Sequence, residues 1–310
     1  MIYRELGKTG MKLSNLGFGA SSLGGVFHSI NEEEGIQAVH IAIEKGVNFI
    51  DVSPYYGFTK AETVLGKALK DIPREKYYLS TKVGRFGEAG VNSWDYSAGK
   101  AKKSVYESLE RLNVDYVDVI NVHDIEFSDL DQVINETLPA LHEMKEKGLA
   151  RHVGITGLPL AKLKYVIEHT PKGTVETILS FCHYCLNDDA LVDYIPFFEE
   201  HGVGIINASP LSMGLLSERG WPDWHPANEE LKKRVVMAVN HCKSKHYRIE
   251  KLAMKFSVSN PKITTTLVSS SNPNNFTQNI RWIDEPQNDT LLQEVLDILK
   301  PVSCLTWENT

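Results

Sequence analysis

The chain has 310 residues, of which 42% are hydrophobic and 24% charged, and its formal net charge at pH 7 is −7. This composition is that of an ordinary globular protein with the size of one large α/β domain. The acidic balance argues against a general nucleic-acid binder, and no apolar run approaches the ~20 residues that cross a bilayer. The start MIYRELGKTG lacks the apolar segment of a secretory signal, and four cysteines do not make a disulfide framework in a chain this long. We therefore expect one domain over residues 1–310 in the cytoplasm, with no membrane or nucleic-acid partner, and leave a monomer and a weak dimer both open.

The chain begins with a predicted hairpin and continues as strand–helix units. Residues 2–14 alternate around a Lys-Thr-Gly turn, which is typical of a β-hairpin. Asn31, with Glu34 three residues later, predicts the start of the first helix. The predicted strand–helix pairs are 16–20 with 32–45, 48–52 with 60–70, 77–83 with 98–112, 117–122 with 129–147, 152–156 with 159–169, 176–181 with 189–201, 203–208 with 229–246, and 264–269 with 273–281. One further helix is expected over 288–300.

These eight pairs predict an α/β fold, a (β/α)8 TIM barrel with an N-terminal β-hairpin and a C-terminal extra helix. The strands are largely continuous apolar runs, as in parallel sheets that helices cover. Eight units are the number that closes a barrel. The pattern alone leaves an open doubly wound sheet as the alternative.

Four residues that suit proton-transfer chemistry stand at or just beyond three successive strand ends. The run NFIDVSPYYG (48–57) ends a strand at Asp51 and carries Tyr56, YYLSTKVG carries Lys82, and VDVINVHD carries His123. A buried carboxylate needs a partner, and a nearby cation favours the ionised form of a tyrosine. Each residue has an ordinary structural explanation, but the carboxyl ends of barrel strands converge on one face, where catalytic groups gather. The four together therefore predict a catalytic site.

Other motifs are weaker. Tyr56 and Lys60 have the spacing of the short-chain dehydrogenase pair, but Gly57 interrupts the helix on which that pair would lie. Gly17-x-Gly19 lacks the third glycine of a dinucleotide fingerprint. Cys182 and Cys185 form a CxxC, yet residues three apart on a strand point to opposite faces and a zinc site needs four ligands. Cys242 and His246 supply only two ligands, so we predict no metal site.

The runs RELGKTGMKLSNLGFG, NFIDVSPYYG, LSTKVG and VHD, in this order, resemble the aldo-keto reductases over essentially the whole chain. The resemblance implies a (β/α)8 barrel with a nicotinamide nucleotide over the strand carboxyl ends. It implies that Tyr56 is the acid/base, Lys82 lowers its pKa, Asp51 orients Lys82, and His123 orients the substrate oxygen. The cofactor-binding residues that it implies are Ala20, Ser21, Thr156, Ser209, Leu211, Met213, Gly214, Ser269, Ser270, Ser271, Asn275, Gln278 and Asn279.

Several positions depart from the family pattern. Gly157, Phe181 and Ala208 stand where members often place an Asn, a Gln and an aromatic ring around the nicotinamide, so Tyr184 is a candidate for the missing contact. In NADP-specific members a Lys and an Arg after strand eight grip the 2′-phosphate, and here those positions hold Ser269 and Asn275. Neutral groups suit a free ribose diol better than a phosphate, which favours NAD.

The leading functional prediction is the NAD-dependent oxidation of the C1 hydroxyl of an aldose to a lactone. The resemblance favours L-galactose as that sugar, in the synthesis of ascorbate. Sugar contacts are expected from residues on the loops beyond the strand ends, namely His28, Trp94, Asp124 and Tyr184. The alternatives are an NADPH-dependent carbonyl reductase and a regulatory, redox-sensing subunit on the same fold, like the potassium-channel β subunits.

Overall fold

The N-terminal residues form a hairpin that closes the amino end of a barrel. The computed structural model describes residues 1–26, 29–88 and 91–307. Strands β1 (Tyr3–Glu5) and β2 (Lys12–Ser14) pair antiparallel, as the sequence predicts. Three apolar side chains of the hairpin region, Leu6, Met11 and Leu13, pack against the lower interior of the barrel. The open end of the barrel is therefore the opposite one.

Eight parallel strands close into a barrel in chain order, which confirms the predicted fold and excludes the open sheet. The last strand pairs with the first through Val268 and Phe18. The barrel strands are β3 (Leu16–Gly19), β4 (Phe49–Asp51), β5 (Tyr78–Val83), β8 (Val117–Val122), β9 (Ala150–Gly157), β10 (Thr177–Phe181), β11 (Gly204–Ala208) and β12 (Thr265–Ser269). Their inner side chains near the hairpin are apolar, and five of them are Phe49, Val119, Leu179, Ile206 and Leu267.

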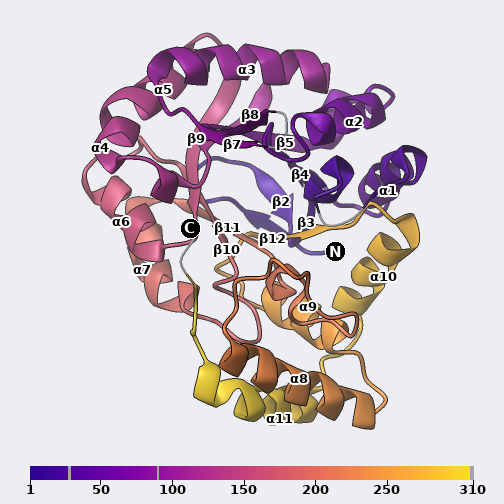
Figure 1. Ribbon diagram of the computed structural model, residues 1–310. Coiled ribbons are helices and arrows are strands. Elements are labelled where there is room, and N and C mark those ends of the chain that lie inside the picture. The colour runs from indigo at the N-terminus through magenta and orange to yellow at the C-terminus, as the bar shows by residue number, and fades with distance from the viewer. Residues whose placement is uncertain (27–28, 89–90, 308–310) are drawn as a thin grey trace.

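Helices surround the barrel (Figure 1). They are α1 (Glu32–Glu44), α2 (Lys60–Leu69), α3 (Ala98–Leu112), α4 (Leu130–Gln132) continued through a π-helical turn (Val133–Thr137) into α5 (Leu138–Glu146), α6 (Leu160–Glu168), α7 (Leu191–His201), α9 (Ile249–Ser259) and α10 (Pro273–Asp284). The Asn31 side chain accepts hydrogen bonds from the backbone N–H groups of Glu33 and Glu34, so the predicted cap of α1 is present.

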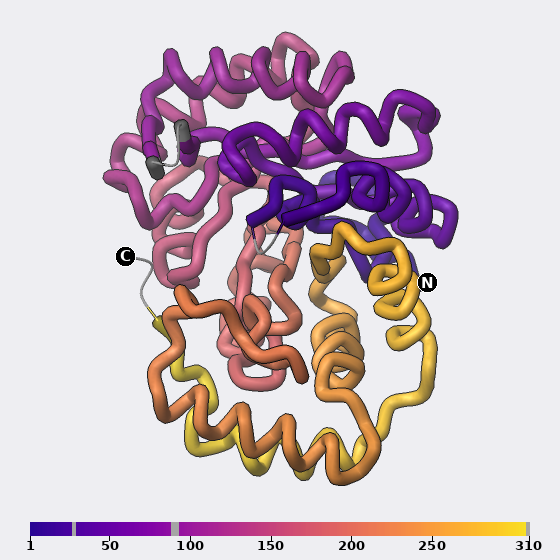
Figure 2. Tube along the Cα trace, turned by 45° about the vertical axis from the view of Figure 1, so that its right-hand side comes forward, coloured from indigo at the N-terminus to yellow at the C-terminus, as the bar shows by residue number. Residues whose placement is uncertain are grey.

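The helix predicted over 229–246 does not cover the barrel. It is α8 (Glu229–Ser244), and it packs beside α11 (Asp289–Leu299) around a second apolar cluster, as Figure 2 shows at the bottom of the view. The barrel helix before β12 is α9, which the sequence analysis missed. Asn228 caps α8 with its side chain, whereas no side chain caps α9 at Arg248. The missing start signal explains the error.

A second hairpin was also missed. Strands β6 (Arg85–Glu88) and β7 (Val91–Trp94) pair antiparallel directly after β5, at the carboxyl end of the barrel. Among the residues that the structure describes, no helix is long and apolar enough to cross a membrane.

Candidate active site

The structure brings the four predicted side chains together at the carboxyl end of the barrel. Lys82, on β5, donates from Nζ to Oδ2 of Asp51 at 2.5 Å and to the carbonyl oxygen of Val52 at 2.8 Å. The same Nζ lies 5.1 Å from the ring centroid of Tyr56. The rings of Tyr56 and His123 are perpendicular, with centroids 5.7 Å apart. Asp51, Lys82 and His123 are each at most 3% exposed, so this is a preorganised, largely dry cluster.

A strained turn presents Tyr56. The backbone N–H of Tyr56 donates to the carbonyl of Ser53, which closes a tight turn after β4. Gly57 follows with φ of 62°, and a Cβ there would lie 2.1 Å from the carbonyl oxygen of Gly24. Only glycine fits both the conformation and the close approach. Because α2 begins at Lys60, Tyr56 and Lys60 are not neighbours on one helix, and the short-chain dehydrogenase arrangement is absent.

Burial controls the protonation of the four groups. Burial lowers the pKa of His123 to about 3, so the imidazole is neutral. Burial would also lower the pKa of Lys82, but the charge and hydrogen bond of Asp51, together with the charges of Tyr56 and Asp124, outweigh it and the pKa is raised. Burial raises the pKa of Tyr56 to about 12 although Lys82 opposes the shift. Lys82 therefore offsets part of the desolvation cost without bringing the Tyr56 pKa below its ordinary value.

Asp124 lies beside the cluster and is itself an ion-pair partner. Its Oδ2 accepts from Nη1 of Arg85 at 2.5 Å, and its Oδ1 accepts from Oγ1 of Thr156 at 3.2 Å. Burial would raise the pKa of Asp124, but the charge and the hydrogen bond of the Arg85 guanidinium, together with the charge of Lys82, hold that pKa below its usual range. The Thr156 hydroxyl also accepts from the Asp124 backbone N–H at 2.9 Å. Thr156, which was expected at the cofactor, therefore makes both of these hydrogen bonds with Asp124.

Arg85 was missed by the sequence analysis. Its guanidinium lies 4.0 Å from the ring centroid of Tyr55 and 4.8 Å from that of Phe127, and its Nη2 donates to the Tyr55 hydroxyl at 3.1 Å. Trp94 continues this aromatic group, since its ring lies 5.2 Å from that of Phe127. The available signal was the position of Arg85 in the sequence. It comes three residues after Lys82, just beyond the end of β5 at the same face of the barrel.

Tyr184, a third expected substrate residue, does not join this group. Tyr184 is 7% exposed and stacks on Phe256 of α9 at 5.0 Å, in the layer between barrel and helix. Two residues before it, Cys182 has a positive φ of 62°. Tyr184 therefore offers little exposed surface for the expected substrate or nicotinamide contact, which stays a prediction. His28 lies outside the described residues.

The expected cofactor residues lie on three segments at the carboxyl end. Ser269 ends β12, and its Oγ accepts from the backbone N–H of Ser22 at 2.8 Å and from Oγ of Ser21 at 3.0 Å. The buried Oγ of Ser22 has no hydrogen-bond partner among the described residues, so it can form a hydrogen bond with a polar ligand. The remaining expected residues are Ala20 in η1 (Ala20–Gly24), Ser209, Leu211, Met213 and Gly214 at or near η5 (Ser212–Gly214), and Ser270, Ser271, Asn275, Gln278 and Asn279 at or in α10.

The cysteines give neither a metal site nor a reactive thiol near this face. Cys182, Cys185 and Cys242 are buried free thiols, and burial raises the pKa of Cys182 to about 12. Within residues 1–26, 29–88 and 91–307, no group of three or more His, Cys, Asp or Glu side chains could hold a metal ion.

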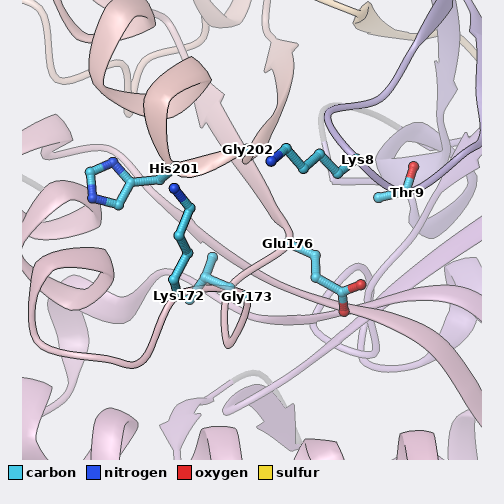
Figure 3. Close-up of a pocket in the computed structure, with 8 residues that line it drawn as sticks. Lys8, Thr9, Lys172, Gly173, Glu176, His201 and Gly202 are labelled. Atoms are coloured by element: carbon cyan, nitrogen blue, oxygen red, sulfur yellow. The ribbon is translucent and has the colours of Figure 1, made fainter.

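A cavity of about 360 Å³ lies at the other end of the molecule (Figure 3). It is lined by Lys8 of the first hairpin turn, together with Lys172, Glu176 and His201. The Lys172 ammonium donates to the carbonyl of Glu200, and Glu176 is paired with Lys145 and His152. None of these residues reaches the four clustered side chains, so the cavity is separate from the candidate active site.

A tyrosine beside a lysine–carboxylate pair and a neutral histidine, at the open end of a (β/α)8 barrel, is an arrangement that can move a proton at a substrate oxygen. The chain matches the model of the Aldo/keto reductase family over residues 15–299. It belongs to the aldo-keto reductase family, as the sequence motifs indicate, and is an oxidoreductase that uses a nicotinamide cofactor.

Particular relatives narrow the comparison. The chain is 48% identical over 312 aligned residues to the L-galactose dehydrogenase of Arabidopsis thaliana, covering 99% of this chain and 97% of that protein. It is 31% identical to the D-arabinose 1-dehydrogenase of Saccharomyces cerevisiae, over 71% of this chain and 68% of the yeast protein. An aldo-keto reductase from Bacillus halodurans, solved in its holo form, superposes with a TM-score of 0.82 at 25% identity, covering 100% of this chain and 99% of that one.

Proposed function

We propose that the protein is an NAD-dependent aldose 1-dehydrogenase that oxidises the C1 hydroxyl of L-galactose to the lactone. The observation that carries the proposal is the placement of Tyr56 against the Lys82–Asp51 pair and His123 at the open end of the barrel. The identity of 48% to an L-galactose dehydrogenase supports the sugar. In an organism that makes ascorbate through L-galactose, this oxidation would belong to that route.

The four residues divide the chemistry of the alcohol between them. Tyr56, as phenolate, takes the hydroxyl proton of the sugar, and Lys82 stabilises that phenolate. Asp51 holds the Lys82 ammonium in place through the 2.5 Å hydrogen bond. His123 donates a hydrogen bond to the substrate oxygen. NAD, when bound, accepts the hydride from C1, so the products are the lactone, NADH and one proton.

Asp124 and its partners form the proposed sugar-binding wall. The Asp124 carboxylate is fixed by Arg85 and Thr156 and still has lone pairs that can accept from sugar hydroxyls. Trp94 is 41% exposed next to Phe127, and such a ring can cover the apolar face of a sugar. A rigid, charged acceptor beside exposed aromatic rings suits a polyhydroxylated substrate better than a simple carbonyl compound.

The adenosine end favours NAD over NADP. Residues 269–279 contain no Lys or Arg, and Asn275 is exposed. Glu34 of α1 reaches this segment, because its Oε2 accepts from Nδ2 of Asn272 at 3.2 Å. A 2′-phosphate at this segment would face the Glu34 carboxylate, and no Lys or Arg of residues 269–279 could pair with it. The neutral hydroxyls and amides suit the ribose diol of NAD.

The direct test is a panel of aldoses assayed with NAD and with NADP by absorbance at 340 nm. We expect turnover with L-galactose and a far higher kcat/KM for NAD than for NADP. Loss of turnover in Tyr56→Phe, with NAD binding retained, is the matched control. Absence of turnover with every aldose would refute the proposal and favour the regulatory subunit, while a preference for NADPH-dependent reduction would favour the carbonyl reductase.

The four free cysteines fit the reducing cytoplasm that we propose as the compartment.

A further inference from the structure

Ser53 joins the turn that carries Tyr56 to the ring of His123. It lies two residues beyond Asp51 and is fully buried. Its Oγ accepts from the backbone N–H of Tyr55 at 3.1 Å and lies 3.0 Å from Nδ1 of His123. Among the described residues, Ser53 is the hydrogen-bond partner of that ring nitrogen. One buried hydroxyl thus links two of the groups that act on the substrate.

The direction of the Ser53–His123 hydrogen bond follows from counting donors and acceptors. The hydroxyl has one proton to donate, and the Tyr55 N–H already occupies one of its lone pairs. Nδ1 of His123 is the one acceptor that the described residues offer to this proton. If Nδ1 carried a proton instead, the Ser53 hydroxyl proton would be buried without an acceptor, which is costly. Ser53 therefore donates to an unprotonated Nδ1.

The other ring nitrogen is then the protonated one. Nε2 of His123 lies 3.6 Å from Oδ2 of Asp124, a distance at which an N–H is favourable and a lone pair is repelled. Since the ring is neutral, it carries only one proton, and its position decides whether the histidine donates or accepts at the open end of the barrel.

We propose that Ser53 is a positioning residue, whose hydroxyl holds His123 with Nε2–H directed at the substrate oxygen beside Tyr56. The identity of that oxygen rests on the proposed function. The fixed ring supplies a hydrogen bond that needs no reorientation when the sugar binds.

The first test is the nitrogen NMR spectrum of the protein labelled with ¹⁵N-histidine, with the His123 signals assigned by their loss in His123→Gln. The expected result for the wild type is a protonated Nε2 and an unprotonated, hydrogen-bonded Nδ1. In Ser53→Ala the Nδ1 resonance should move to the position of a nitrogen without a hydrogen bond. A protonated Nδ1 in the wild type would overturn the inference, and this measurement needs neither Ser53→Ala nor any activity.

The second test separates positioning from general packing. Ser53→Ala should lower kcat by roughly three- to tenfold, the range for one lost hydrogen bond, while the Kd for NAD stays unchanged. Ser104→Ala is the matched control, since Ser104 is a buried serine of α3 whose hydroxyl has no partner among the described residues. A Ser53→Ala enzyme with the wild-type kcat or the wild-type Nδ1 resonance would overturn the inference. If the wild type oxidises no aldose, the proposed function fails, but the tautomer remains testable.

Discussion

The substitution Lys82→Met separates the stability of the buried ion pair from its part in catalysis. The side chains of Lys82 and Asp51 are only 1% and 4% exposed, so removing the ammonium leaves a buried carboxylate without its counter-ion. Breaking such a pair costs about 3–5 kcal/mol of unfolding free energy. Adding Asp51→Asn removes the stranded charge, and the double variant should recover most of the loss. Both variants should have kcat reduced by ~10²–10⁴, because Tyr56 has lost its cation.

The pH dependence gives the sign of the effect. Burial already raises the pKa of Asp51 in the wild type although Lys82 opposes the shift, so Lys82→Met should raise the pKa of the folded state further above that of the unfolded chain. The folded state then binds the Asp51 proton more tightly than the unfolded chain does. The free energy of unfolding therefore falls as the pH rises from the unfolded-state pKa of Asp51 through its folded-state pKa. Urea unfolding of the wild type, both single variants and the double variant at two pH values measures this. A loss below about 1 kcal/mol in Lys82→Met would refute the buried-pair reasoning.

Three further predictions concern the reaction and its ligands. Since burial holds the pKa of Tyr56 at about 12, kcat for oxidation should rise with pH across the alkaline range, and a rate independent of pH would contradict Tyr56 as the base. Asp124→Asn keeps an acceptor but loses the charge opposite Arg85. In steady-state assays the KM for the sugar should therefore rise roughly tenfold while the KM for NAD stays constant. Equal changes in both KM values would argue against a sugar contact. Glu34→Gln should tighten NADP binding about two- to threefold at low salt, with less effect at high salt. The control Glu33→Gln, on the same exposed helix turn, should not change NADP binding. Equal NADP titration curves for the two variants would refute the role of Glu34.

The barrel and the cluster of Asp51, Tyr56, Lys82 and His123 could be predicted because they depend on strand ends. Apolar runs locate the strands, and a parallel barrel brings all carboxyl ends to one face, so a residue's place in its run determines which face it reaches. No side-chain geometry is needed for that step.

The sequence was less informative where loops decide direction. Tyr184 follows β10 by three residues, whereas His123 directly follows β8, and after the positive φ at Cys182 the Tyr184 ring stacks on Phe256 of α9. Arg85 reaches Asp124 only because an unpredicted hairpin begins there. Similarly, Asp124 could be placed near the substrate, but its pairing with Arg85 is long-range and leaves no local signal in the sequence.

In the proposed reaction a hydride passes from C1 of an aldose to the nicotinamide at the open end of the barrel. The most direct measurement is oxidation of C1-deuterated L-galactose by the wild-type enzyme with NAD, followed by mass spectrometry of the reduced cofactor. We expect NADH that carries the deuterium, and we expect Tyr56→Phe to abolish its formation. Reduced cofactor without deuterium, or equal formation by Tyr56→Phe, would contradict the proposed reaction.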